Sequence, residues 1–347
     1  MISLEELQLA ARNHGMPLEA LRWDVTPVGL HYLLTHFDIP LVDESWRLAV
    51  DGNVAEPFEL SLDELRALPA HEVVSTMECA GNGRARLEPH VVSQPWLQEA
   101  VGTGRWCGVR LRDLIDRARP GAGVVEVLFT GLDRGVEGGE EQAYQRSLPL
   151  DLARDDDLLL AYELNGEPLP PQHGRPLRLL VPGWYGMTNV KWLARVTFVD
   201  EPFTGYQQTH GYRVRQTEDE DGVPVDRIQP RALMVPPGIP EYMTRERTVH
   251  AGSVLLEGRA WSGRGPVTAV DVSTDGGATW SPAPVEPPEL GRWAWQRWTF
   301  AWQAEPGHHV LACRARDAAG GEQPLEPAWN LGGYVNNAVQ RVPVVVV

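Results

Sequence analysis

The alternation of hydrophobic and polar positions over the first two hundred residues predicts strands mixed with short helices. Capping boxes, in which a serine and a glutamate three residues later bind each other's backbone N–H groups, begin helices at Ser3 and Ser61. We expect these helices to end near Gly15 and Pro69, and apolar spacing predicts another helix over 111–118. Strand-like apolar runs lie at 46–50, 72–76, 124–130, 158–162, 177–181 and 190–199. This mixture is typical of an α+β domain.

The pattern changes between residues 217 and 240. Residues 217–222 form an acidic, solvated run, and the proline-rich segment 235–240 is typical of a stiff linker. The runs that follow have the spacing of an immunoglobulin-like β-sandwich. They lie at 254–261, 267–274, 293–302 and 309–316. In the third run the alternation of tryptophans changes phase at Gln296, which predicts a β-bulge.

A length of 347 residues suggests more than one core, and we divide the chain into an N-terminal extension (1–30), a first domain (31–230) and a second domain (231–347). The formal net charge of -16 disfavours binding to nucleic acid or to an anionic membrane surface. No stretch approaches the ~18 apolar residues of a membrane span, and the first residues carry no targeting pattern. We therefore expect a cytoplasmic protein that binds any anionic substrate in a local basic pocket.

Three cysteines without a CxxC pair argue against a disulfide scaffold and against a structural zinc site. Cys79 stands out because it follows a predicted strand in the segment Cys-Ala-Gly-Asn-Gly-Arg, which ends at Arg84. Glycine-rich backbone and an arginine suit an anion, and a thiol near cations becomes the thiolate that a soft metal prefers. Taken alone, however, an isolated cysteine is more often a small buried apolar residue.

A second group of candidate residues is basic. His173, Arg175, Arg178 and Lys191 fall within twenty positions around predicted strand ends. Such a group could bind a phosphate or a pterin-like anion, and it could equally be a set of solvated loop charges. The glycine pair at 121–123 precedes a strand, so it does not have the position of a dinucleotide-binding loop.

Nine segments strengthen these interpretations when they are taken together. They are 34–40, 77–84, 103–106, 160–169, 173–183, 190–193, 260–263, 272–277 and 329–338. In content and order they resemble the sulfite oxidase family of molybdopterin enzymes, which includes the assimilatory nitrate reductases. The resemblance covers roughly residues 30 to 345, and it favours a functional Cys79 over a structural one.

The resemblance implies an α+β molybdopterin-binding domain of the sulfite oxidase fold, followed by an all-β immunoglobulin-like dimerisation domain, and hence a homodimer. It implies that Cys79 coordinates molybdenum beside the pterin dithiolene. The residues that it implies for anchoring the pterin and its phosphate are His36, His173, Arg178 and Lys191. Those that it implies for the substrate pocket are Arg84, Trp106 and Tyr212. The segment from Tyr206 to Tyr212 is one residue longer than the usual family spacing.

The activity implied by the resemblance is oxygen-atom transfer, with sulfite oxidised to sulfate. The chain has no CxxCH haem-attachment motif. We therefore expect no haem, and a separate electron acceptor such as a cytochrome, a quinone or oxygen.

The sequence departs from the family at Leu34 and Gly332, where sulfite-oxidising members have arginines. Each lost charge-assisted hydrogen bond could cost about 1.5–3 kcal/mol of sulfite binding. Four residues could compensate: His31, Arg105, His210 and Arg213. The departures leave open a different substrate, such as nitrate, an S- or N-oxide, or another reduced sulfur compound. A binding or adhesion protein without a cofactor is a further alternative.

Overall fold

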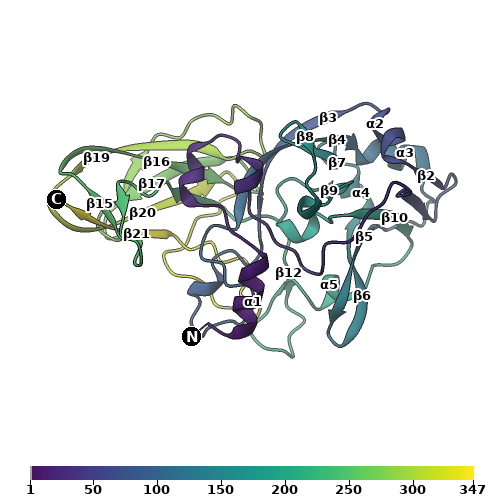
Figure 1. Ribbon diagram of the computed structural model, residues 1–347, viewed down its shortest axis with the longest axis horizontal. Coiled ribbons are helices and arrows are strands. Elements are labelled where there is room, and N and C mark those ends of the chain that lie inside the picture. Colours follow the sequence, from purple (N-terminus) through teal and green to yellow (C-terminus); the bar gives the residue numbers. More distant parts are fainter. Residues whose placement is uncertain (1) are drawn as a thin grey trace.

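The computed structural model describes residues 2–347 and shows two β-rich halves, with the N-terminal segment at their boundary (Figure 1). Its α-helices are α1 (Leu4–Arg12), α2 (Leu62–Arg66), α3 (Leu111–Ala118), α4 (Leu150–Ala153) and α5 (Tyr206–Thr209). The predicted capping boxes at Ser3 and Ser61 are both present, and α3 has the predicted bounds. Helix α1 ends before the predicted Gly15, because Asn13 already has an extended backbone.

Within residues 2–347, the first half contains two five-stranded sheets. One has the order β2 (Phe58–Leu60), β1 (Leu48–Gly52), β10 (Leu193–Val199), β5 (Glu126–Glu137) and β6 (Glu140–Pro149). The other has the order β3 (His71–Glu78), β4 (Val101–Arg110), β7 (Leu159–Leu164) and β8 (Glu167–Pro168), with β9 (Arg178–Leu180) paired to β7. Strands β1 and β10 run parallel, and the other paired strands run antiparallel.

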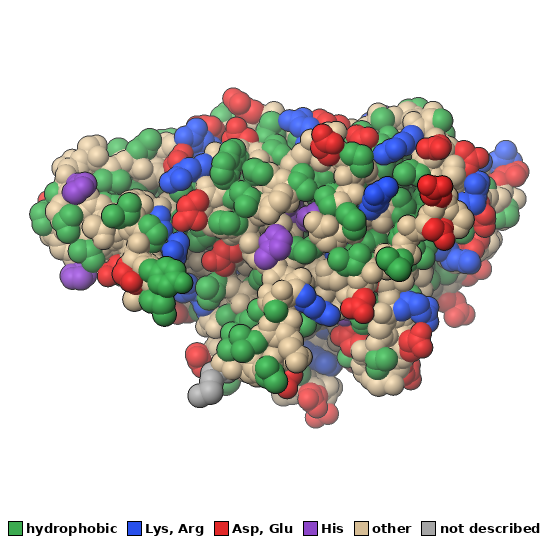
Figure 2. Space-filling model, in the orientation of Figure 1, with side chains coloured by type: hydrophobic (Ala, Val, Ile, Leu, Met, Phe, Trp, Pro, Cys, Tyr) green, Lys and Arg blue, Asp and Glu red, His purple; other side chains and the backbone are tan. Residues whose placement is uncertain are grey.

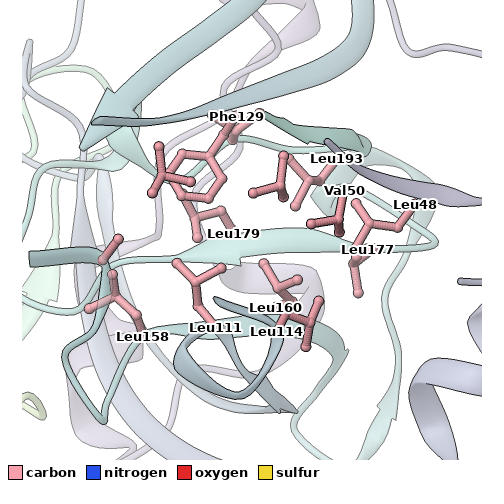
Figure 3. Close-up of a cluster of buried hydrophobic side chains, with 14 of the residues drawn as sticks. Leu48, Val50, Leu111, Leu114, Phe129, Leu158, Leu160, Leu177, Leu179 and Leu193 are labelled. Atoms are coloured by element: carbon pink, nitrogen blue, oxygen red, sulfur yellow. The ribbon is translucent and has the colours of Figure 1, made fainter. Parts of the chain in front are cut away.

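The two sheets share one core with helix α3, and Figure 3 shows its centre. Phe129 of β5 and Val50 of β1 lie on one side of it, and Leu160 of β7 and Leu179 of β9 lie in the other sheet. Burying these side chains stabilises the packing of the two sheets by roughly 25 cal/mol for each Å² of apolar surface removed from water. The core therefore fixes the position of the second sheet, from which the site described below is built.

The second half is a β-sandwich, as the strand spacing predicts. One sheet is formed by β13 (Arg231–Met234), β16 (Gly252–Trp261) and β19 (Gln296–Ala304). The facing sheet is formed by β14 (Ile239–Pro240), β15 (Arg247–Val249), β21 (Gln340–Val346), β20 (Gly307–Asp317), β17 (Val267–Ser273) and β18 (Ser281–Ala283). A separate pair, β11 (Arg213–Val214) and β12 (Val223–Pro224), borders the acidic run of the first half. Apolar side chains of both sandwich sheets form one buried cluster, which includes Trp298 and Leu311.

Two predictions for this half are wrong. The segment 235–240 is not a linker, because β13 before it already pairs with β16, and its last two residues form β14. The bulge at Gln296 is also absent: the pairing of β16 with β19 is regular from Gln296 to Ala304. The tryptophan alternation changes phase because Trp293 and Trp295 lie in a turn before the strand begins.

The N-terminal segment packs into the boundary between the halves. Met16 and Leu21 belong to a buried cluster with Trp261 and Trp295 of the second half. Acidic side chains are spread over both halves of the face shown in Figure 2. Within the part of the chain that the structure describes, no helix has both the length and the apolar character needed to cross a bilayer.

Candidate active site

Two pockets meet where strand β3 ends. Counted together with the open solvent at its mouth, the space of the inner pocket is about 670 Å³ and that of the outer pocket is about 1260 Å³. Leu34, His36, Cys79 and Tyr212 line both pockets. A molecule that enters the outer pocket can therefore meet a group bound in the inner pocket at these four residues.

Cys79 follows β3 directly and begins a tight loop. Its backbone N–H donates to Ala100 O at 2.9 Å, and its carbonyl accepts from Asn82 N at 3.0 Å. A Cβ at Gly81 would lie 2.6 Å from the Arg84 guanidinium, so a glycine is needed for Arg84 to fold back over the loop. Gly83 has a φ of 91°, which favours glycine. The two glycines thus bring Arg84 to the wall of the same pocket as Cys79.

Glu78, the residue before Cys79, is held from three directions. Its carboxylate lies 2.8 Å from Arg231 Nε and accepts from Trp261 Nε1 at 2.8 Å and from Asn82 Nδ2 at 3.0 Å. Arg231 and Trp261 belong to the second half, and both Glu78 and Arg231 are 1% exposed. The sandwich therefore positions the cysteine loop of the first half through one buried carboxylate.

The surroundings of Cys79 suit a thiolate that ligates a metal. Burial raises the pKa of the Cys79 thiol, while the Arg84 charge and the Trp96 indole favour the thiolate. A bound metal ion would add the positive charge that the buried thiolate needs. Residues 2–347 contain no group of three or more His, Cys, Asp or Glu side chains placed to bind a metal ion.

The inner pocket is lined by a buried cation, Arg178, and a half-buried one, Lys191. Arg178 donates to the carbonyls of His173 and Asn189 at 3.1 and 3.2 Å, and Lys191 donates to the carbonyls of Leu34 and Gln172 at 2.8 and 3.0 Å. Burial lowers the pKa of Arg178 to about 10 and that of Lys191 to about 7. Within the described chain neither cation has a carboxylate within 4 Å. Such charges are costly to bury unless an anion joins them.

Other polar groups of the inner pocket are buried without partners and fit a bound polar ligand. Burial lowers the pKa of His31 to about 4, and burial and the nearby His31 lower that of His173, so both imidazoles are neutral at pH 7. Burial raises the pKa of Asp133 to about 6, although Lys191 opposes the change. His31 Nε2, Arg178 Nε and Asp133 Oδ1 are buried without hydrogen-bond partners in residues 2–347. The Arg178 Nε donor, together with the two cations, fits an anion such as a pterin phosphate, whereas Asp133 Oδ1 and His31 Nε2 are acceptors and fit N–H groups of the same ligand.

Guanidinium groups and phenol rings pack together beside the outer pocket. Arg84 lies 5.1 Å from the ring centre of Tyr334, which is 5.3 Å from that of Tyr212, and Arg146 lies 5.9 Å from the Tyr212 ring. Burial raises the pKa of Tyr212, so its phenol stays protonated and can donate a hydrogen bond. Tyr212 has a φ of 50°, a strained conformation that is concentrated at functional sites.

The structure brings most of the predicted site residues together. The inner pocket is lined by His36, Cys79, His173, Arg178, Lys191 and Tyr212, and the outer pocket by His36, Cys79, Arg84 and Tyr212. His36 bridges the pockets, with its Nε2 2.8 Å from Glu137 Oε2. The placement of these side chains is compatible with the predicted roles, which remain predictions.

Trp106 does not lie where it was predicted. It is fully buried, 4.8 Å from the Arg178 guanidinium, and it lines neither pocket. Trp96 lines the outer pocket instead. Sequence reasoning missed Trp96 because it lies in an irregular segment without periodicity. It also missed Tyr334, although this residue falls within the matched segment 329–338.

The residues that could have compensated at Leu34 and Gly332 lie elsewhere. Arg105 pairs with Glu72 at 2.6 Å, and Arg213 donates to the carbonyl of Gly222 at 2.8 Å. His210 stacks on Tyr206. His31 lines the inner pocket but not the outer one.

Comparison with known proteins gives two family matches. Residues 36–207 match the model of the oxidoreductase molybdopterin binding domain, and residues 232–347 match that of the Mo-co oxidoreductase dimerisation domain. The structure resembles that of the sulfane dehydrogenase SoxCD from Paracoccus pantotrophus, with a TM-score of 0.81 and 26% identity over 94% of this chain and 82% of that chain.

Several relatives are similar along nearly the whole chain. Rat mitochondrial sulfite oxidase is 38% identical, over 93% of this chain and 62% of its own length. Chicken sulfite oxidase is 37% identical, over 91% of this chain and 72% of its own length. Barley nitrate reductase [NAD(P)H] is 34% identical, over 92% of this chain and 39% of its own length. The chain thus spans about 62% of the length of its mammalian relatives.

Proposed function

The chain belongs to the sulfite oxidase family of molybdenum-cofactor oxidoreductases, and on that premise we propose that it oxidises sulfite to sulfate by oxygen-atom transfer. The observation that carries the proposal is the position of Cys79 at the junction of the two pockets. The inner pocket contains two cations suited to an anionic cofactor. The outer pocket presents Arg84 to an anionic substrate.

We assign the cofactor to the inner pocket. Cys79 would ligate the metal, and His36, His173, Arg178 and Lys191 would hold the pterin and its phosphate. When bound, a molybdenum–molybdopterin cofactor supplies two-electron oxygen-atom exchange with the substrate. Trp106 would act through Arg178, by packing on its guanidinium, and would not contact the substrate.

The side chains at the junction would bind and orient the substrate. Arg84 carries a positive charge on the wall of the outer pocket, and Tyr212 places a protonated phenol where the pockets meet. Both can donate hydrogen bonds to an oxyanion. Trp96 covers the same wall with an aromatic surface and limits the access of water.

The proposal extends to partners and location. Electrons would leave to a separate acceptor, namely a cytochrome, a quinone or oxygen, and residues 232–347 would form the interface of a homodimer. An immunoglobulin-like topology for the sandwich, a cytoplasmic location and the absence of haem stay predictions. Sedimentation of the purified protein tests the dimer, and cell fractionation tests the location.

A second candidate function keeps the cofactor and changes the substrate. Leu34 and Gly332 place no charged side chain beside Arg84, and the similar proteins include a nitrate reductase and a sulfane dehydrogenase. Reduction of nitrate or of an S- or N-oxide, or oxidation of another reduced sulfur compound, is therefore the alternative.

The test is sulfite oxidation by molybdenum-loaded protein with ferricyanide as acceptor. We expect saturable turnover that is lost in Cys79→Ser, together with close to one molybdenum per chain by elemental analysis. A loaded enzyme that ignores sulfite but reduces nitrate or an S-oxide would support the second candidate. Protein that contains no molybdenum after expression with molybdate would contradict both.

A further inference from the structure

The outer pocket has the charge balance of a site for a monoanion. Its wall includes three arginines, at 12, 84 and 134, and two carboxylates, Asp38 and Glu137. Arg12 lies 3.9 Å from Asp38, and Arg134 lies 3.1 Å from Glu141 at the rim. Counted over its arginines and carboxylates, the wall carries one positive charge in excess. The third arginine, Arg84, has no carboxylate of residues 2–347 within 4 Å.

Arg84 has little donor capacity left for a ligand. Its Nε donates to Gly332 O at 3.0 Å, and its Nη1 donates to Ser93 Oγ at 3.1 Å and to Gln94 O at 3.3 Å. No acceptor for its Nη2 occurs within the described chain. One guanidinium nitrogen is therefore available, and this suits a small anionic group with a single charge.

Tyr334 occupies the space that a side chain at position 332 would need. A Cβ on Gly332 would lie 2.6 Å from Tyr334 Cδ2, so any side chain at 332 would collide with the ring. Gly332 does not have a positive φ, so the ring and not the backbone excludes a side chain. The pocket thus presents a half-buried aromatic ring where a longer polar side chain could otherwise lie.

The remainder of the wall is partly apolar. Its apolar and aromatic side chains are Leu9, Leu34, Phe37, Trp96, Val136 and Tyr334. Sulfite, with three oxygens around one sulfur, has no apolar surface to place against them. A carbon substituent would gain roughly 25 cal/mol for each Å² of apolar surface removed from water.

We propose that the substrate class of this site is the organosulfinates, R–SO2⁻. A sulfinate keeps the sulfur lone pair and two of the oxygens of sulfite, carries one charge, and has an organic group for the apolar wall. The balanced reaction is R–SO2⁻ + H2O → R–SO3⁻ + 2H⁺ + 2e⁻, in which a sulfur–oxygen bond forms and water loses both O–H protons. Two equivalents of a one-electron acceptor take the electrons. This inference rests on the proposed oxygen-atom transfer and makes a sulfinate, one of the reduced sulfur compounds of the second candidate function, the preferred substrate in place of sulfite.

The first experiment compares benzenesulfinate, methanesulfinate and sulfite as substrates of molybdenum-loaded enzyme, with ferricyanide as acceptor. We expect kcat/KM for benzenesulfinate to exceed that for sulfite by about tenfold or more, with two ferricyanides reduced for each benzenesulfonate identified by mass spectrometry. Turnover of sulfite without turnover of either sulfinate would overturn the inference and leave the proposed function intact. Turnover of none of the three would overturn both.

A binding experiment does not depend on turnover. Calorimetric titration of the loaded enzyme with benzenesulfonate and with sulfate compares a monoanionic organic product with a dianion. We expect benzenesulfonate to bind about tenfold more tightly, and equal or weaker binding would overturn the inference.

Leu34→Arg adds a cation to the wall and should shift the ratio of kcat/KM toward sulfite by about tenfold. Leu41→Arg is the matched control, because Leu41 is fully exposed and lines neither pocket. If Leu34→Arg fails to fold, Gly332→Arg combined with Tyr334→Ala adds the cation from the other half. An unchanged ratio in a folded, loaded variant would overturn the inference.

Discussion

Glu78→Ala tests how the two halves hold the cysteine loop. The substitution would leave Arg231 buried at 1% exposure without its carboxylate partner at 2.8 Å. Removing one member of a buried ion pair costs about 3–5 kcal/mol, because the remaining charge is neither hydrated nor paired. The Trp261 indole would also lose its acceptor, and the Asn82 amide would keep only Gln98 O at 3.3 Å. Against a typical total of about 5–15 kcal/mol, this is a large share of the free energy of unfolding.

The measurement is urea unfolding followed by tryptophan fluorescence, in the wild type and in two comparison variants. Glu56→Ala removes an exposed pair with Arg119 at 3.6 Å and should cost less than about 1 kcal/mol. Glu78→Met combined with Arg231→Met replaces the whole pair with apolar side chains of similar length. This double variant should recover most of the lost free energy, since no unpaired charge remains buried.

Two results would refute the reasoning. A cost for Glu78→Ala no larger than that for Glu56→Ala would mean that Arg231 finds water or another partner. A double variant as unstable as Glu78→Ala would mean that packing around the carboxylate, and not its charge, stabilises the loop. In either case the ion pair would not couple the sandwich to Cys79.

Four further substitutions have defined expectations. In apo-protein, the pKa of Lys191 is about 7 in the folded state, below its unfolded value, so the folded state binds fewer protons and the free energy of unfolding should rise with pH above 7. Calorimetric melting at several pH values should show a smaller rise for Lys191→Met than for the wild type. An equal rise would mean that Lys191 is not the group responsible. Trp106→Phe should reduce the molybdenum content by weakening the packing on Arg178. Trp96→Phe should lower kcat/KM at unchanged molybdenum content. The reverse pattern would mean that Trp106 contacts the substrate and that Trp96 supports cofactor binding. Ser61→Ala removes a capping box and should cost about 0.5–2 kcal/mol by urea unfolding, and no loss would mean that packing alone holds α2.

Helices and strands that are specified by neighbouring residues could be predicted from the sequence. The capping boxes at Ser3 and Ser61 act within four residues, and helix α3 follows from apolar spacing on one face. Most predicted strands correspond to observed ones. Strands β4 and β6 were not predicted, because glycines such as Gly102 and Gly104, and charged residues, interrupt their alternation. The linker and bulge predictions failed because strand pairing, which is not local, decides where β13 and β19 begin.

The residues of the candidate site also fall into those that the sequence identified and those that only the structure revealed. Cys79 was identified by its place between a strand and a glycine-rich loop, and the basic group at 173–191 by its density of charge. By itself the sequence determined the capped helices, the two kinds of β-rich half and the thiol. Only the tertiary structure decided that Trp96 and not Trp106 reaches the outer pocket, that Tyr334 occupies the space beside Gly332, and that Arg231 supports Cys79 through a carboxylate. The pair of Arg231 with Glu78 joins residues about 150 positions apart, and all these relations depend on packing and on the burial of charge, which no local pattern encodes.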